Sequence, residues 1–317
     1  MIESDLIVKA LAYASGIGIG AAAITLIYST TRTFNFAHAS MVAWGFYIVF
    51  TMTTFFGGSP YYYLPLAGLF SSLLGIILYL AVNRRLLERG ASEVTLMMST
   101  LGVDLIFFGF LNVYIDYIAR LIAARNIPVN PFFFVLETKD FTIPYLNIRG
   151  AGLVGPLILV VGVLFLHLLL TRTKIGIAMR ASIENPSLAA SLGVNPYIIY
   201  LVAWILGGFM AGLSGGFLSL VQTGNNYVGM LLIVSFFAGS IVGGLYSIFG
   251  SLLGGLLIGL SEYIGIYLLS IYLGGGILAY RPAIPLAVMV ATLLIQPSGL
   301  AGVNWQGLYR KLREILR

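Results

Sequence analysis

The chain has 317 residues, of which 59% are hydrophobic and 9% are charged, whereas soluble domains carry about 25% charged residues. This composition excludes a soluble domain and predicts an all-α, polytopic helical membrane protein. The absence of cysteine excludes disulfides and thiolate metal sites, and the two histidines lie too far apart in sequence to suggest a metal site. The net charge of +6 does not indicate nucleic-acid binding, because the Lys and Arg residues cluster beside apolar runs.

The apolar runs predict about nine spans within a single transmembrane domain, 1–317. A run needs about 20 residues to cross a hydrocarbon core of about 30 Å. The stretch 229–269 is too long for one helix, so we split it near Tyr246 and Ser247. The predicted spans are 6–28, 34–56, 64–82, 94–115, 151–170, 197–221, 229 to about 246, about 247–269, and a short last span at 282–295.

The longest predicted non-spanning segment is 116–150. It mixes charged residues with three consecutive phenylalanines, Phe132 to Phe134, and three prolines. This mixture favours an interfacial element on the external membrane surface over a disordered linker.

The basic residues predict the orientation of the spans. Eleven of the 17 Lys and Arg residues fall in the stretch at Arg32, the cluster at 84–89, the loop 172–196 and the amphipathic tail 305–317. These segments lie on one side of a nine-span topology, which the positive-inside rule assigns to the cytoplasm. The N-terminus is then external and the C-terminus cytoplasmic.

Two polar interruptions follow the first and sixth predicted spans, at 32–38 and at 222–226, and both contain asparagine. Paired interruptions in two halves of a transporter point to a central binding site and to broken helices. The residues of the two halves match poorly, so the predicted pseudo-repeat rests on architecture.

The polar loop 172–196 reads as two short helices with a break at Pro186. Asn185 is suited to cap the second helix, Pro186 to its first turn, and Gly193 to its C-terminal end. The second helix is rich in alanine, so we expect another protein to approach it closely and expect Ala189→Trp to block that contact. A bland alternative is a basic helical connector between two spans.

This loop resembles the cytoplasmic coupling loop of ATP-binding-cassette (ABC) importer permeases, specifically the branched-chain amino acid permease family. Two other stretches resemble the same family, 35–38 (NFAH) and 243–250 (GGLYSIFG), the latter continuing to Glu262. The resemblance implies that the loop couples to the ATPase through Gly176, Arg180, Ala181, Glu184, Asn185, Pro186, Leu188, Ala189 and Gly193.

The resemblance further implies uptake of branched-chain or related amino acids across the cytoplasmic membrane. It implies cytoplasmic ABC ATPase subunits, a second permease subunit that is identical or homologous, and an external solute-binding protein. The chain lacks a GxxxxGK[ST] phosphate-binding loop, so we expect no catalytic residues, no cofactor and no metal in it; ATP and Mg²⁺ belong to the partner ATPase. Amides and urea are alternative solutes.

Polar residues within the apolar runs are the candidates for the substrate path, because such groups are costly in a membrane. The candidates are Asn35, His38, Gln222, Asn226 and Glu262. Asn35 and His38 either contact a zwitterionic solute or satisfy the backbone of a broken helix. The family motif usually continues with Gly and an acid where this chain has Ala39 and Ser40. Glu262 either faces a pore, pairs with Arg281 or lies near an interface.

Two other functional classes stay open. A proton-coupled secondary transporter or channel would use Asp104, His38 or Glu262 as proton-coupling groups. A membrane scaffold needs no solute at all. The coupling loop favours the importer over both, because neither alternative requires a docking loop of this kind. Glycines at four-residue spacing, such as Gly208, Gly212 and Gly216, predict close helix packing in all three cases.

Overall fold

The computed structural model describes residues 2–143 and 148–302, and the predicted basic tail 305–317 lies outside the described residues. The helices of the first part are α1 (Ile2–Thr31), α2 (His38–Phe56), α3 (Leu64–Leu78), α4 (Arg84–Glu88) and α5 (Glu93–Ala124). Those of the second part are α6 (Ala151–Arg172), α7 (Lys174–Glu184), α8 (Pro186–Ser191), α9 (Pro196–Leu218), α10 (Val228–Gly243), α11 (Ile248–Leu273) and α12 (Ala283–Ile295). A two-stranded antiparallel sheet, β1 (Thr142–Ile143) and β2 (Ile148–Arg149), precedes α6.

The helical membrane architecture predicted from the composition is confirmed. Eight helices in the described residues are long and apolar enough to cross a membrane, and α10 is a ninth, shorter apolar helix. At 1.5 Å per residue α10 covers about 24 Å, less than the hydrocarbon core of about 30 Å. The split of 229–269 is also confirmed, since α10 ends at Gly243 and α11 begins at Ile248.

The fourth span is longer than the sequence predicts. We placed its end at Ile115, but α5 continues to Ala124. Ile115, Ile118 and Ile122 continue the buried face of the helix, while Asp116 and Arg120 point outward and do not interrupt it. The non-spanning segment between α5 and α6 therefore begins at residue 125.

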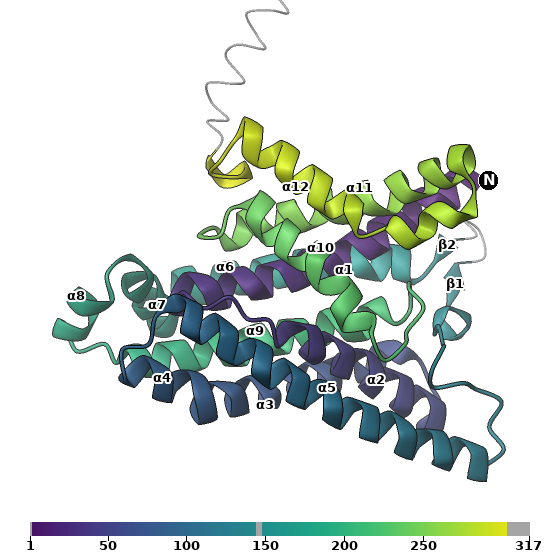
Figure 1. The fold of residues 1–317 in the computed structure, drawn as a ribbon, viewed down its shortest axis with the longest axis horizontal. Helices are drawn as coiled ribbons and strands as arrows, with labels where there is room; N and C mark the ends of the chain where they lie inside the picture. Colours follow the sequence, from purple (N-terminus) through teal and green to yellow (C-terminus); the bar gives the residue numbers. More distant parts are fainter. Residues whose placement is uncertain (1, 144–147, 303–317) are drawn as a thin grey trace, which may run out of the picture.

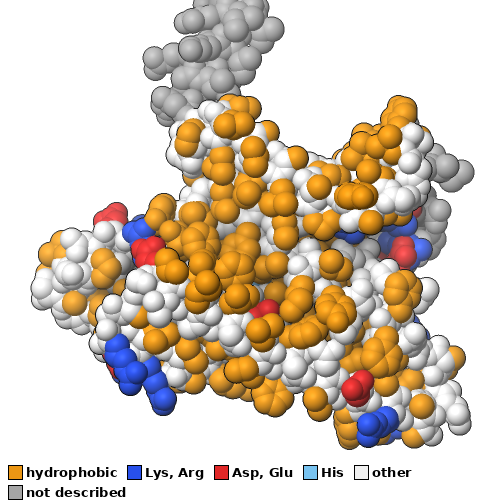
Figure 2. Space-filling view, in the orientation of Figure 1, with side chains coloured by type: hydrophobic (Ala, Val, Ile, Leu, Met, Phe, Trp, Pro, Cys, Tyr) orange, Lys and Arg blue, Asp and Glu red, His pale blue; other side chains and the backbone are white. Residues whose placement is uncertain are grey.

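The two polar ends of the helix bundle are formed by different elements. The start of α1 and the strands β1 and β2 lie at one end, and α7 and α8 lie at the other (Figure 1). Charged side chains gather mainly at these two ends, with a broad apolar band between them (Figure 2). At the first end Glu137 pairs with Lys9 (3.3 Å) and Arg149 (2.9 Å), so the segment after α5 is fastened to α1 and β2.

The helices form two halves of opposite orientation. The series α1, α2, α3 and α5 corresponds to α9, α10, α11 and α12. α1 packs against α11 as α9 packs against α3, and α1 and α9 pack against each other at the centre. Gly18 faces Gly255 and Ala14 faces Gly259, so α1 and α11 run in opposite directions; Ser214 Oγ donates to Gly16 O (2.7 Å) between α9 and α1. The structure thus contains the repeat that the paired interruptions indicate.

Glycines make these helix contacts possible. A Cβ atom on Gly255 would overlap the backbone of Gly18, and one on Gly212 would overlap the backbone of Ala67 in α3. The same holds for Gly239 of α10 against Gly255. The predicted close packing is confirmed, and it recurs in both halves.

Candidate functional site

The α7–α8 loop has the local structure that its sequence predicts. Thr173 Oγ1 accepts from Gly176 N (3.0 Å) at the start of α7, and Asn185 Oδ1 accepts from Leu188 N (3.0 Å) at the start of α8. Pro186 occupies the first turn of α8. Gly193 follows the helix with φ of +87°, a left-handed conformation that glycine adopts without steric cost. The loop is therefore a defined helical unit.

The outer surface of this loop differs from our expectation. Ala189 is only 2% exposed, so it packs inside its own chain and cannot be the surface that a partner approaches. A tryptophan at this position would disrupt the loop itself, so Ala189→Trp does not isolate a contact with a partner. Leu188 and Leu192 are instead 58% and 76% exposed: Leu188 precedes Ala189 on α8 and points to another side, and Leu192 follows the end of the helix.

The other predicted coupling residues divide into buried and exposed groups. Gly176 is buried where α6 meets α7, and a Cβ there would overlap Leu169 O. Arg180, Glu184, Asn185 and Pro186 are exposed, and Ala181 is half-buried. The exposed members of this set therefore supply one cation, Arg180, and one anion, Glu184, close to the exposed leucines.

The first interruption, 32–37, lies inside the membrane-spanning part of the chain. Asn35 and His38 are both fully buried. Among the described residues, neither ring nitrogen of His38 has a hydrogen-bond partner, and His38 packs edge-on against Phe236 of α10 at 5.3 Å. Asn35 Oδ1 is likewise without a described partner. Neither side chain lines an open path in this conformation.

Two side chains of α5 satisfy the backbone of this interruption. Thr100 Oγ1 accepts from Phe36 N (3.0 Å), and Asp104 Oδ1 accepts from Ser40 N (3.0 Å) in the first turn of α2. Ser40 Oγ donates in return to Asp104 O (3.1 Å). Asp104 therefore acts as the N-terminal cap of a helix that begins within the membrane, about 16 Å along α5 from Glu93 at 1.5 Å per residue.

The second interruption, between Leu218 and Val228, holds Gln222 and Asn226. Asn226 Nδ2 donates to Asn112 Oδ1 (3.0 Å) on α5. Asn112 lies twelve residues before the end of α5, or about 18 Å at 1.5 Å per residue, so this interruption also lies within the bilayer. Both residues are half-buried, and Gln222 Oε1 has no partner among the described residues.

Glu262 belongs to a buried cluster that joins four elements. Its Oε1 accepts from Tyr13 OH (2.9 Å) and from Arg281 Nε (2.6 Å), and its Oε2 accepts from Ser235 Oγ (2.7 Å). The Arg281 guanidinium also stacks over the Tyr13 ring, 4.5 Å from its centre. Of our three alternatives for Glu262, the structure contains the pair with Arg281.

The predicted path residues thus form three groups rather than one site. Asn35 and His38 lie at the first interruption, Gln222 and Asn226 at the second, and Glu262 in the ionic cluster. α2 and α10 pack against each other, so the first two groups are close to a shared helix contact. Within residues 2–143 and 148–302, no group of three or more acidic or histidine side chains is arranged to hold a metal ion.

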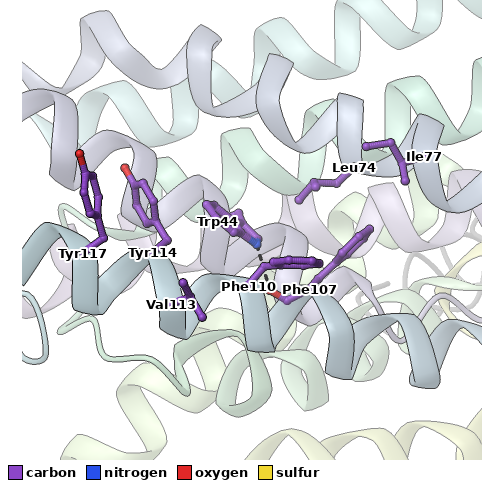
Figure 3. Close-up of a pocket in the computed structure, with 8 residues that line it drawn as sticks. All are labelled: Trp44, Leu74, Ile77, Phe107, Phe110, Val113, Tyr114 and Tyr117. Carbon is purple, nitrogen blue, oxygen red and sulfur yellow. Dashed lines mark hydrogen bonds between the residues drawn. The ribbon is translucent and has the colours of Figure 1, made fainter.

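A large groove beside α5 has a different chemistry. Its volume is about 590 Å³, and Figure 3 shows it lined by Trp44, Leu74, Ile77, Phe107, Phe110, Val113, Tyr114 and Tyr117. Trp44 Nε1 donates to Phe107 O (3.2 Å), and Tyr114 OH donates to Thr51 Oγ1 (2.9 Å), so these polar atoms are already engaged. An apolar groove of this kind suits lipid chains better than a zwitterionic solute.

Several residues of these sites escaped prediction. Thr100, Asn112, Tyr13 and Ser235 each hold a polar group of an interruption or of the ionic cluster. For Thr100 the available signal was its spacing from Asp104, which lies four residues later on the same helix face. Tyr13 carries no comparable signal, because its partner lies 249 residues away in sequence.

Comparison with known proteins gives a consistent result. The family model described as "Branched-chain amino acid transport system / permease component" matches residues 6–294. The "Probable branched-chain amino acid transport permease protein LivH" of Methanocaldococcus jannaschii is 38% identical over 98% of this chain and 96% of its own length. The high-affinity branched-chain amino acid transport system permease protein BraD of Pseudomonas aeruginosa is 25% identical, over 93% of this chain and 94% of its own. The corresponding LivH of Escherichia coli strain K12 is 23% identical, over 88% of each chain. No solved structure matches the chain significantly.

Proposed function

Because the chain belongs to the branched-chain amino acid transport permease family, we propose that it is the transmembrane subunit of an ABC importer. The chain is a multi-pass protein of the cell membrane. It would move branched-chain or related amino acids inward, driven by ATP hydrolysis in separate cytoplasmic subunits. A second permease subunit and an external solute-binding protein complete the proposed assembly, and the chain itself binds neither nucleotide nor metal.

The α7–α8 loop is the observation that carries this proposal. A loop that only connects two spans needs no capped helix, yet Asn185 fixes α8 in place and leaves Leu188 and Leu192 exposed at the polar end of the molecule. ATP hydrolysis in a partner can move the spans only through a contact that differs between two states of the complex. We assign that contact to the exposed residues of the loop, with Gly176 and Ala189 as its internal support.

The substrate proposal rests on the chemistry of the two interruptions. The side chains that we assign to the path there are three amides and one imidazole, and Asp104 is engaged as a helix cap. Amides beside apolar walls suit a small zwitterion with an aliphatic side chain. We assign Asn35, His38, Gln222 and Asn226 to the path, and Glu262 to the support of the helices beside it.

Reconstitution tests the energy source. The chain, assembled in vesicles with its ATPase and binding protein, should take up labelled leucine only with ATP, and uptake should survive collapse of the proton gradient. Uptake by the isolated chain under a pH gradient would instead establish the proton-coupled carrier. In competition assays, unlabelled isoleucine and valine should displace the label, and displacement by a sugar or metal ion alone would reject the substrate class.

A further inference from the structure

The segment after α5 contains three consecutive phenylalanines, and only one of them enters the protein. Phe132 and Phe133 are exposed, whereas Phe134 is 6% exposed. Its ring stacks on Phe50 with 3.9 Å between ring centres and meets Tyr47 and Phe46 edge-on at 5.3 and 5.7 Å. The segment between α5 and α6 therefore places one aromatic side chain into the core beside α2.

The backbone of the same segment is bonded to the second interruption. Phe134 N donates to Gly224 O (3.2 Å), and Gly224 N donates to Phe134 O (2.7 Å). Leu136 N donates to Ser219 O (2.9 Å), and Tyr47 OH donates to Pro131 O (3.0 Å). Residues 131–136 thus supply partners to backbone groups that the end of α9 leaves free.

Gly224 is fitted to this contact. A Cβ atom there would overlap the ring of Phe46 and reach the ring of Phe134 at 3.0 Å. The interruption also contains Gln222 and Asn226, which we assign to the substrate path. Ser219, directly beneath Leu136, is fully buried.

We propose that Phe134 is a positioning residue for transport: it anchors residues 131–136 over the second interruption and closes that interruption from the external side. This proposal deepens the proposed function, because it identifies what covers one of the two path regions. The backbone of the first interruption is bonded to side chains of α5, a spanning helix that stays in the membrane. In the part of the chain that the structure describes, the second is bonded to α5 only through Asn226 and Asn112, and its Ser219 and Gly224 are held by a loop, whose displacement would free these two residues together.

Cysteine labelling tests this closure directly, because the chain contains no cysteine of its own. Ser219→Cys is a near-isosteric reporter beneath the segment, and a membrane-impermeant maleimide is added to the external side of intact cells. Ser214→Cys, buried on the same helix, is the matched negative control. Lys139→Cys, exposed in the segment between α5 and α6, is the positive control.

With Phe134 present, Ser219→Cys should label slowly and Lys139→Cys quickly. Phe134→Ala should raise the labelling rate of Ser219→Cys by at least about tenfold, since loss of a buried ring favours the open form. Phe134→Leu, which keeps an apolar side chain, should restore slow labelling. Ser214→Cys should stay unlabelled throughout.

Equal labelling of Ser219→Cys with and without Phe134→Ala would overturn the proposal. So would a parallel rise at Ser214→Cys, which would indicate general loosening of the bundle. Where Phe134→Ala does not reach the membrane, Gly224→Ala provides a second test, because its methyl group would overlap the Phe46 ring and crowd the Phe134 ring that packs beside it. Labelling requires neither ATPase nor amino acid, so its result is independent of whether the importer assignment holds.

Discussion

The two halves of the molecule share an architecture and differ in how they satisfy their broken helices. In the first half one carboxylate, Asp104, closes the interruption by capping α2. In the second half the buried carboxylate, Glu262, lies away from the interruption and joins α11 to α1, α10 and Arg281. Within the described residues, the interruption of the second half has one bond to α5, from Asn226 to Asn112, and its backbone is otherwise bonded to residues 131–136.

The two interruptions therefore differ in whether the group that bonds to their backbone can move away from them. A cap carried on a spanning helix moves only with that helix, whereas a loop on the membrane surface can be displaced from outside. The two halves are therefore related in shape but not equivalent in mechanism. Substitutions that act on one half without the other can test this distinction.

The largest expected effect is at the ionic cluster of the second half. Glu262→Ala leaves the partly buried Arg281 guanidinium, whose side chain is 28% exposed, without its carboxylate, so we expect a loss of about 3 kcal/mol in the free energy of unfolding. Thermal unfolding of the purified protein in detergent measures the change. The double variant Glu262→Ala, Arg281→Ala should lose less than the sum of the single variants, because no unpaired charge remains. Additive losses would mean that the pair contributes no coupling energy.

A smaller effect is expected at the cap of the first half. Asp104→Ala leaves Ser40 N without an acceptor, so we expect a loss of about 1–3 kcal/mol in stability. Asp104→Asn keeps an acceptor oxygen and should retain most of the stability and all of the ATP-dependent uptake. Loss of uptake in a stable Asp104→Asn protein would instead indicate that the carboxylate takes part in proton coupling.

A still smaller effect is expected at the second interruption. Asn226→Ala removes the hydrogen bond to Asn112, and such bonds between membrane helices average about 0.6 kcal/mol. Stability should hardly change, while uptake should fall if Asn226 contacts the solute. Asn112→Ala removes the same bond and serves as its control. Equal uptake in both variants would assign Asn226 to packing alone.

The smallest effect on stability is expected in the segment that joins the halves. Leu188→Asp replaces an exposed apolar side chain, so the fold should be unchanged. Binding of the ATPase, measured by co-purification, should weaken by about tenfold or more, as for an apolar residue at the centre of an interface. Asn195→Ala, which alters a neighbouring cap, is the control for disturbance of the loop. Unchanged association in Leu188→Asp would show that the loop is only a connector.

Local features of the sequence predicted much of this structure. Asn185, Pro186 and Gly193 shape only the backbone within a few residues of their own positions, so the sequence alone predicted the α7–α8 loop. The glycines at four-residue spacing predicted close contacts in the same way. The pairing of those glycines, such as Gly18 with Gly255, could not be predicted, because the spacing of glycines on one helix does not identify the helix that packs against it.

Non-local contacts account for the features that the sequence left open. Three phenylalanines stand in a row, and no local pattern distinguishes Phe134 from Phe132 or Phe133; the pocket at Phe46, Tyr47 and Phe50 does. Ala189 looked accessible because it is small, yet the loop folds back over it. The role of Asp104 depends on where α2 begins, which only the fold determines.

The crossed packing of the two halves has a consequence for synthesis. α1 packs against α11, and the facing residues Gly18 and Gly255 are separated by most of the chain. A ribosome adds about 5–20 residues per second, so α1 waits on the order of 10–50 s in the bilayer before its partner emerges. During that interval the face of α1 that will contact α11 is not covered by that helix. The α3–α9 contact can form sooner, because fewer residues separate these two helices. We expect α1 to be held first by α6 and α9, with its glycine-bearing face covered only when α11 leaves the translocon.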